Sequence, residues 1–189
     1  VNTISNKQMI ERATLSYGYG ISVTLLQLAR AYAVLANKGK RLPVRFTRVD
    51  KDVNGQAVLA ENTSRQIISM MESVITEEGT GKLASIPGYR VAGKTGTVKK
   101  ITIGGYSDKK YLSIFAGLVP ASNPRMVMVV TVDEPAGGVY YGGEVAAPVF
   151  SKVMAGALRI LDIAPDAINA DVEYAVAQSN IIKTEMVGR

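Results

Sequence analysis

Hydrophobic residues recur every three or four positions in two stretches of the first half of the chain, which predicts two amphipathic helices. The first helix is expected to begin after Thr24, whose hydroxyl can form a capping box with Gln27, and to stop at the Asn-Lys-Gly segment 37–39. Its predicted apolar face consists of Leu25, Leu28, Ala29, Tyr32, Leu35 and Ala36. The second helix repeats the capping signal with Thr63 and Gln66. Its predicted apolar face consists of Ile67, Met70, Met71 and Val74.

The pattern changes to strand-like runs in the middle of the chain. Residues 89–97, 112–119 and 126–133 are rich in apolar and β-branched side chains. The last two runs are nearly continuous, as expected of strands that are covered on both faces. The connections 104–105 and 121–124 have turn composition and are short enough for hairpins, so the sheet should be antiparallel.

Weaker signals flank this sheet. Short strands are expected between residues 41 and 60, and a helix from about residue 145 to 161. The small residues 155–157 would let that helix lie close to a sheet, and its predicted apolar face consists of Val149, Val153, Gly156 and Ile160. Together these elements predict an α+β fold in which an antiparallel sheet is covered by helices. We expect residues 1–165 to form one domain portion and residues 166–189 a tail.

Composition and charge narrow the chemistry. The 189 residues include no cysteine and no histidine, which excludes a thiol nucleophile, an imidazole base and a zinc site of the usual ligands. The net charge of +6 suits an anionic ligand. The basic residues are scattered rather than clustered, so we do not expect nucleic-acid binding. No apolar run is long enough to span a bilayer.

The segment Lys94-Thr95-Gly96-Thr97 carries the strongest chemical signal. Its glycine would let a substrate backbone lie against the strand, while two threonine hydroxyls and a lysine can bind a carboxylate. A strand-end N–H can also stabilise an oxyanion. We therefore expect an edge strand paired with residues 112–119, with both threonines accessible in a cleft, because only an edge leaves backbone groups free. A polar strand end without a ligand is the alternative.

Several segments around this motif resemble class B penicillin-binding proteins of the septal type found in Gram-negative bacteria. K-T-G, S-x-x-K and a Ser-x-Asn element mark penicillin-binding proteins and related β-lactamases. The other similar segments occur in the family's order: 11–20, 23–32, 71–74, 79–81, 88–99, 116–121, 140–143 and 147–150. The resemblance covers only the C-terminal part of that family's transpeptidase domain.

The resemblance implies a serine-type peptidoglycan D,D-transpeptidase with the penicillin-binding protein/β-lactamase fold. Such an enzyme cross-links the cell wall at the division septum and is acylated by β-lactams. It implies a D-Ala-D-Ala stem peptide or a β-lactam as ligand, division-machinery proteins as partners, and no metal or organic cofactor. The implied location is the periplasmic face of the inner membrane, anchored by an N-terminal segment that is absent from this chain. The alternatives are a non-catalytic binding or scaffolding module, and a β-lactamase or β-lactam sensor.

The resemblance also implies roles for individual residues. Lys94 would organise the polar network, and Thr95 and Thr97 would bind the ligand carboxylate. The Thr97 N–H would form one half of the oxyanion hole. The tyrosines at 140 and 141 either form an apolar wall of the cleft or simply pack within their loop. The implied site residues are Lys94, Thr95, Gly96, Thr97, Tyr140 and Tyr141.

Two elements of such a site are missing at the positions where the family has them. The only S-x-x-K string is 107–110, a charged segment that follows the K-T-G element. We expect it to be a solvated hairpin loop, because a nucleophile of this class needs a helix N-terminus and a buried lysine. No Ser-x-Asn or Tyr-x-Asn occurs. The serine is therefore expected on an upstream segment of the same protein, and the 189 residues alone are expected to be inactive.

Overall fold

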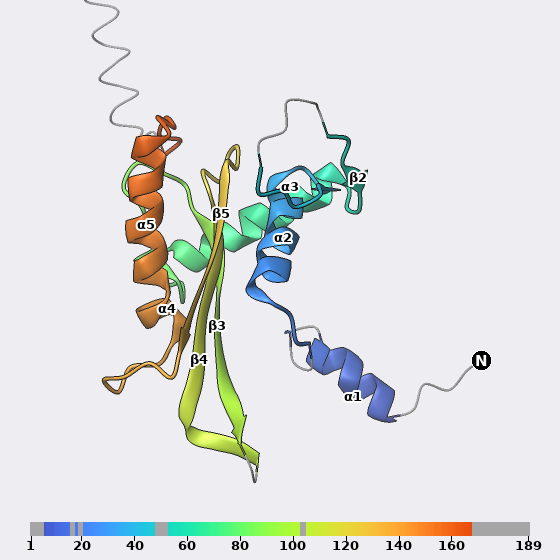
Figure 1. Ribbon diagram of the computed structural model, residues 1–189, viewed down its shortest axis with the longest axis vertical. Coiled ribbons are helices and arrows are strands. Elements are labelled where there is room, and N and C mark those ends of the chain that lie inside the picture. The colour runs from blue at the N-terminus through green and yellow to red at the C-terminus, as the bar shows by residue number, and fades with distance from the viewer. Residues whose placement is uncertain (1–5, 16–17, 19–20, 48–52, 103–104, 168–189) are drawn as a thin grey trace, which may run out of the picture.

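A central antiparallel sheet of three strands organises the fold (Figure 1). A computed structural model gives the structure, and it describes residues 6–15, 18, 21–47, 53–102 and 105–167. The strands lie in the order β3-β4-β5, and their bounds are Ala92–Thr102 for β3, Gly105–Val119 for β4 and Met126–Asp133 for β5. The sheet and its helices confirm the predicted α+β class. Most of the predicted tail, residues 168–189, lies outside the described residues.

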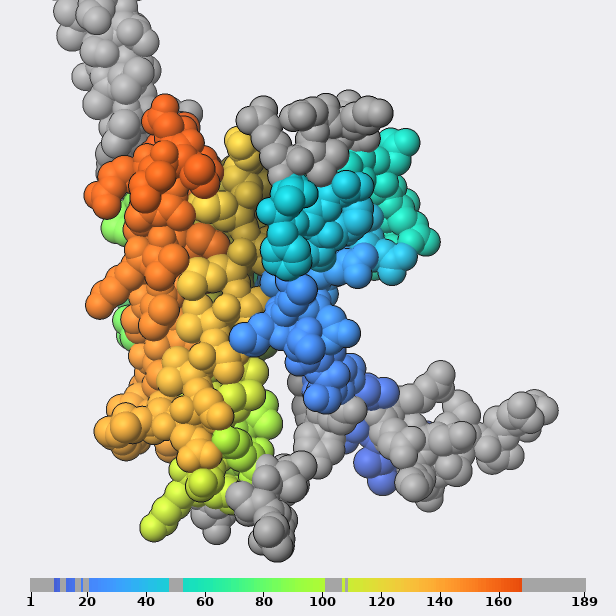
Figure 2. Space-filling view, in the orientation of Figure 1, coloured from blue at the N-terminus to red at the C-terminus, as the bar shows by residue number. Residues whose placement is uncertain are grey.

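Helices cover both faces of this sheet. One face carries α2 (Leu25–Ala36) and α3 (Glu61–Glu72), and the other carries α5 (Ala147–Ile160). In the space-filling view β5 (yellow) is visible between α5 (orange) and α2 (blue) (Figure 2). The shorter elements are α1 (Asn6–Leu15), β1 (Lys40–Arg41), β2 (Gln56–Ala57), η1 (Ser73–Ile75), η2 (Lys82–Ala84) and α4 (Gly142–Val145).

The strand β3 is an edge strand. It pairs with β4 from Ala92 opposite Leu118 to Thr102 opposite Gly105, with a register shift between Lys99 and Ile101. No described strand pairs with its outer edge. The predicted edge position and the pairing with residues 112–119 are confirmed, although β3 begins at residue 92 rather than 89.

Helix α2 begins as predicted. The Gln27 N–H donates to the Thr24 hydroxyl oxygen at 3.2 Å, and the Thr24 N–H donates to the Gln27 side-chain oxygen at 2.8 Å. These reciprocal bonds satisfy two N–H groups that the first turn of a helix leaves without partners. The short strands expected after this helix are also present, as β1 and β2. Helix α1 was not predicted.

The predicted start of the second helix is wrong. Helix α3 begins at Glu61, two residues before Thr63, and its N-cap Ala60 makes no side-chain cap bond. An acidic residue in the first turn is favourable there, because it lies at the positive end of the helix dipole. The buried face also differs from the predicted one: it includes Ser64 and Ile68, whereas Met70 is 64% exposed.

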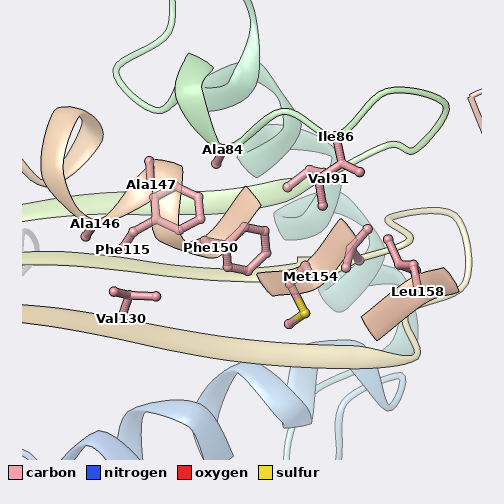
Figure 3. Packing of buried hydrophobic residues seen from close by; sticks show 11 residues of the cluster. Ala84, Ile86, Val91, Phe115, Val130, Ala146, Ala147, Phe150, Met154 and Leu158 are labelled. Atoms are coloured by element: carbon pink, nitrogen blue, oxygen red, sulfur yellow. The ribbon is translucent and has the colours of Figure 1, made fainter. Parts of the chain in front are cut away.

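The predicted apolar face of the last helix is wrong as well. Its buried residues are Ala147, Phe150, Met154 and Leu158, whereas Val153 and Ile160 are 50% and 83% exposed. Phe150 packs edge-on against Phe115 of β4, with ring centroids 4.9 Å apart, in the core between α5 and the sheet (Figure 3). This large aromatic contact stabilises one apolar stripe over the other. A Cβ at Gly156 would meet no atom within 4 Å, so Gly156 does not face the sheet, whereas Ala155 packs against the core.

Candidate active site

The Lys-Thr-Gly-Thr segment lies within β3, opposite β4. Thr95 pairs with Phe115 and Thr97 with Ser113. Since side chains alternate along a strand, both threonines lie on the face that α5 covers, together with Phe115. Lys94, which pairs with Ala116, lies on the opposite face. The strand therefore separates the lysine from the two threonines.

A backbone N–H fixes the hydroxyl of Thr97. The Gly142 N–H, at the start of α4, donates to the Thr97 hydroxyl oxygen at 3.0 Å. A Cβ at Gly142 would lie 2.3 Å from the carbonyl oxygen of Ile114 and 2.4 Å from that of Gly96. Glycine is thus required for α4 to approach β3 and β4 closely enough to make this bond.

The hydroxyl of Thr95 has a different partner. It lies 2.9 Å from the hydroxyl of Thr80, which belongs to the loop between η1 and η2. The next residue of α4 packs against this loop, because a Cβ at Gly143 would lie 1.9 Å from the Thr80 carbonyl oxygen. Three separate segments of the chain therefore meet at the two threonines.

The side chain of Lys94 bonds to the backbone of its own strand, β3. Its side chain is exposed, and its ammonium group donates to the carbonyl oxygen of Thr95 at 2.9 Å. An exposed ammonium group held beside the edge of β3 adds positive charge to this part of the surface.

Gly96 has no structural requirement for being glycine in the described part of the chain. A Cβ there would meet only Ile114, at an ordinary contact distance of 3.5 Å. Its neighbour Gly93 differs, because a Cβ at that position would lie 2.5 Å from the ring of Phe115. The space beside Gly96 is therefore not needed for packing and is available for a ligand.

The two tyrosines lie in a loop that is anchored to β4. The buried hydroxyl of Ser113 donates to the carbonyl oxygen of Tyr140, and the Tyr140 ring stacks on Tyr111 with centroids 3.9 Å apart. The Tyr140 hydroxyl lies 3.4 Å from that of Tyr141 and raises the pKa of Tyr141. Tyr141 itself is 55% exposed. The loop is packed on one side and presents an aromatic surface on the other.

The two threonines are accessible, as predicted: Thr97 is exposed and Thr95 is half-buried. A pocket of about 440 Å³ lies elsewhere, between α2, α3 and residues 121–124, and none of residues 94–97 lines it. A cleft at the threonines stays a prediction.

The expected hairpin loop at residues 107–110 is instead part of β4. The Ser107 hydroxyl oxygen accepts the N–H groups of Lys109 and Lys110, at 3.3 Å and 3.2 Å. Ser107 therefore lies on a strand, away from any helix N-terminus among the described residues.

Within the part of the chain that the structure describes, no group of three or more acidic side chains could hold a metal ion. None of the described helices has the length and apolar character needed to cross a membrane.

Comparison with known protein families shows the family to which the chain belongs. The profile described as the penicillin binding protein transpeptidase domain matches residues 1–155. The chain belongs to this transpeptidase family. The match includes β3, the loop with Thr80 and the start of α5.

Named relatives of this transpeptidase chain have similar sequences. The peptidoglycan D,D-transpeptidase FtsI of Escherichia coli K12 is 49% identical over 159 residues, which are 84% of this chain and 27% of that protein. A probable peptidoglycan D,D-transpeptidase PenA of Neisseria flavescens is 46% identical over 158 residues, 84% of this chain and 40% of that protein. The chain thus spans less than half the length of these relatives.

A solved structure has the same fold. The transpeptidase domain of Burkholderia pseudomallei penicillin-binding protein 3 superimposes with a TM-score of 0.79 and 44% sequence identity. The superposition covers 89% of this chain and 51% of that domain structure. The predicted fold class is therefore confirmed.

Two residues that contact the candidate site could not be identified from the sequence. Thr80 was included only as part of a similar segment, and nothing in the sequence pairs it with Thr95. Ser113 looked like one polar residue in an apolar strand. A threonine between two glycines and a serine in a buried strand are the only signals that were present, and neither specifies a partner.

Proposed function

We propose that this chain forms the strand-borne part of the acyl-transfer site of a serine-type peptidoglycan D,D-transpeptidase, which β-lactams acylate. The observation that carries the proposal is the Lys94–Thr97 segment on the outer edge of β3, with the Thr95 and Thr97 hydroxyls held by neighbouring segments and accessible. The relatives named peptidoglycan D,D-transpeptidases support it.

The geometry is compatible with recognition of a peptide that ends in a carboxylate. In this proposal Thr95 and Thr97 bind the carboxylate of a D-Ala-D-Ala stem peptide or of a β-lactam, and Gly96 leaves room for the ligand backbone. Lys94 organises the polar network, and the Thr97 N–H stabilises the oxyanion of the tetrahedral intermediate. Tyr140 and Tyr141 form an aromatic wall beside the site.

The nucleophile belongs, in this proposal, to a longer protein that carries this chain together with an S-x-x-K segment. The serine oxygen of that segment attacks the carbonyl between the two D-Ala residues, forms an acyl-serine ester and releases the terminal D-Ala. An amine of a second stem peptide then displaces the serine and forms the cross-link. We further propose that this protein acts at the periplasmic face of the inner membrane with division-machinery partners.

Covalent labelling tests this function. The longer protein, incubated with a fluorescent penicillin and separated on a denaturing gel, should carry one label per chain, and an excess of unlabelled penicillin should prevent the labelling. Absence of label would contradict the transpeptidase proposal. Rapid loss of the label by hydrolysis would indicate a β-lactamase instead.

A further inference from the structure

Thr80 connects a separate loop to the strand that carries the candidate site. Its hydroxyl lies 2.9 Å from that of Thr95 and is the side-chain partner of the Thr95 hydroxyl, whereas Lys94 bonds to the Thr95 carbonyl oxygen. The sequence pattern around Thr80 indicates no role for its hydroxyl.

The loop around Thr80 is held in place on both sides. The Gly81 N–H donates to the Val74 carbonyl oxygen at 2.8 Å, and the Gly79 N–H donates to the Thr76 carbonyl oxygen at 2.9 Å. The close approach of Gly143 to the Thr80 carbonyl oxygen leaves no space for the loop to move toward α4. The Thr80 hydroxyl therefore has a defined position relative to β3.

The direction of the bond between the two hydroxyls depends on what Thr95 binds. Each hydroxyl has a single proton, whereas a carboxylate can only accept hydrogen bonds. If Thr95 donates its proton to a carboxylate, the proton between the two threonines must come from Thr80. Thr80, Thr95 and the carboxylate then form a chain in which each hydrogen bond polarises the next.

The Thr97 hydroxyl can also donate its proton to a ligand, but a different group holds it in place. Its hydroxyl oxygen accepts from the Gly142 N–H, which can only donate, so the Thr97 proton remains available for a ligand. Both threonines can thus donate to one anionic group, but only Thr95 depends on a side chain that a substitution can remove.

We propose that Thr80 is a positioning residue for carboxylate recognition: it donates to Thr95 and so directs the Thr95 proton toward the anionic group of the ligand. The inference rests on the proposed function. It predicts that Thr80 contributes to the recognition of ligands with a free carboxylate and contributes little to neutral ligands of the same shape.

The test compares a penicillin with its methyl ester on the longer protein. The second-order acylation rate constant of each compound is measured by competition with a fluorescent penicillin, for the wild type, Thr80→Val and Thr80→Ser. Valine keeps the shape of threonine but has no hydroxyl, whereas serine keeps the hydroxyl. Thr80→Val should slow acylation by the acid about fivefold, the effect of losing a hydrogen bond of roughly 1 kcal/mol, and leave the ester within twofold. Thr80→Ser should restore the rate with the acid.

The ratio of the two rate constants distinguishes positioning from a structural role. Equal slowing of the acid and the ester, or no slowing of either, would overturn the inference. If Thr80→Val does not fold, Thr80→Ala is measured in the same way, because the ratio does not depend on the fraction of active protein. A wild type that penicillin does not label would overturn the proposed function, and the inference with it. A labelled wild type whose ratio the variants leave unchanged would overturn the inference alone.

Discussion

Gly142 and Thr97 are 45 residues apart in the sequence, yet the glycine N–H donates to the threonine hydroxyl at 3.0 Å. The bond joins the start of α4 to β3 and holds the Thr97 side chain on the face that α5 covers. Because the hydroxyl accepts in this bond, its proton is left for a ligand. Thr97 is the first residue to test, because its hydroxyl is accessible, is held in one position and can donate a proton.

Replacing Thr97 with alanine in the longer protein should slow acylation by a fluorescent penicillin by about 10- to 150-fold. Alanine keeps the backbone N–H but loses the hydroxyl that would donate to the ligand carboxylate, and a hydrogen bond to a charged group is typically worth about 1.5–3 kcal/mol. The measurement is the rate of covalent labelling under conditions where the labelling is first order in penicillin.

Ser107→Ala serves as the matched control for this variant. Ser107 belongs to the only S-x-x-K string, but it lies in β4 and its hydroxyl oxygen accepts neighbouring backbone N–H groups. Its labelling rate should equal that of the wild type. If Ser107→Ala abolishes labelling, the nucleophile lies in this chain and its placement on another segment is wrong.

The two glycines of β3 should separate function from stability. Gly96→Ala should change the free energy of unfolding by less than about 0.5 kcal/mol, because its Cβ would meet only Ile114 at 3.5 Å. It should nevertheless slow acylation, since the methyl group would stand where the ligand backbone lies. Gly93→Ala should lower the free energy of unfolding by about 1–3 kcal/mol, because its Cβ would overlap the ring of Phe115. Urea unfolding and labelling rates of both variants test this; a Gly96→Ala variant with unchanged labelling would contradict it.

Glu134 should give the protein a pH-dependent increment of stability. The ammonium groups of Lys100 and Lys110, at 2.8 Å and 3.3 Å, lower the pKa of this carboxyl from its ordinary value of 4.5. A carboxyl whose pKa is lower in the folded state stabilises the fold above its unfolded pKa and loses that contribution as the pH falls through the folded pKa. The increment should therefore be complete above about pH 4.5 and disappear below it.

Glu134→Gln removes the titrating group and tests this expectation. Urea midpoints of the longer protein should fall on acidification by less in this variant than in the wild type, and the difference should shrink in high salt, because the pairs are exposed. Glu78→Gln is the control, since Glu78 forms no ion pair among the described residues. Identical pH profiles for wild type and Glu134→Gln would contradict the role of the lysines.

Purified residues 1–189 should not be labelled by a fluorescent penicillin. They contain no histidine, no S-x-x-K at a helix N-terminus and no Ser-x-Asn, so no activated hydroxyl is available. They should also fail to melt cooperatively as a monomer, because large apolar side chains such as Leu25, Leu26 and Ile160 are more than half exposed. A denaturing gel and a thermal melt are the measurements. Stoichiometric labelling would contradict the first statement, and a cooperative monomeric melt the second.

The sequence by itself determined those features that depend on local interactions. The capping box of Thr24 and Gln27 fixed the start of α2, because both partners lie within one helical turn. The apolar runs and their short connections specified the antiparallel pairing of β3, β4 and β5. The edge position of the Lys94–Thr97 segment was predicted from the free backbone groups that a ligand would need. The similarity of these segments to a known family indicated their chemistry.

Only the tertiary structure decided which of two equivalent local patterns was used. Helix α5 has two apolar stripes, each with residues three or four positions apart, and the contact of Phe150 with Phe115, 35 residues away in sequence, selects the buried one. In the same way Thr80 and Gly142 reach the candidate site because folding brings their segments to β3. Periodicity and capping describe a few neighbouring residues, whereas these contacts depend on the relative positions of whole elements, which the packing of the core sets.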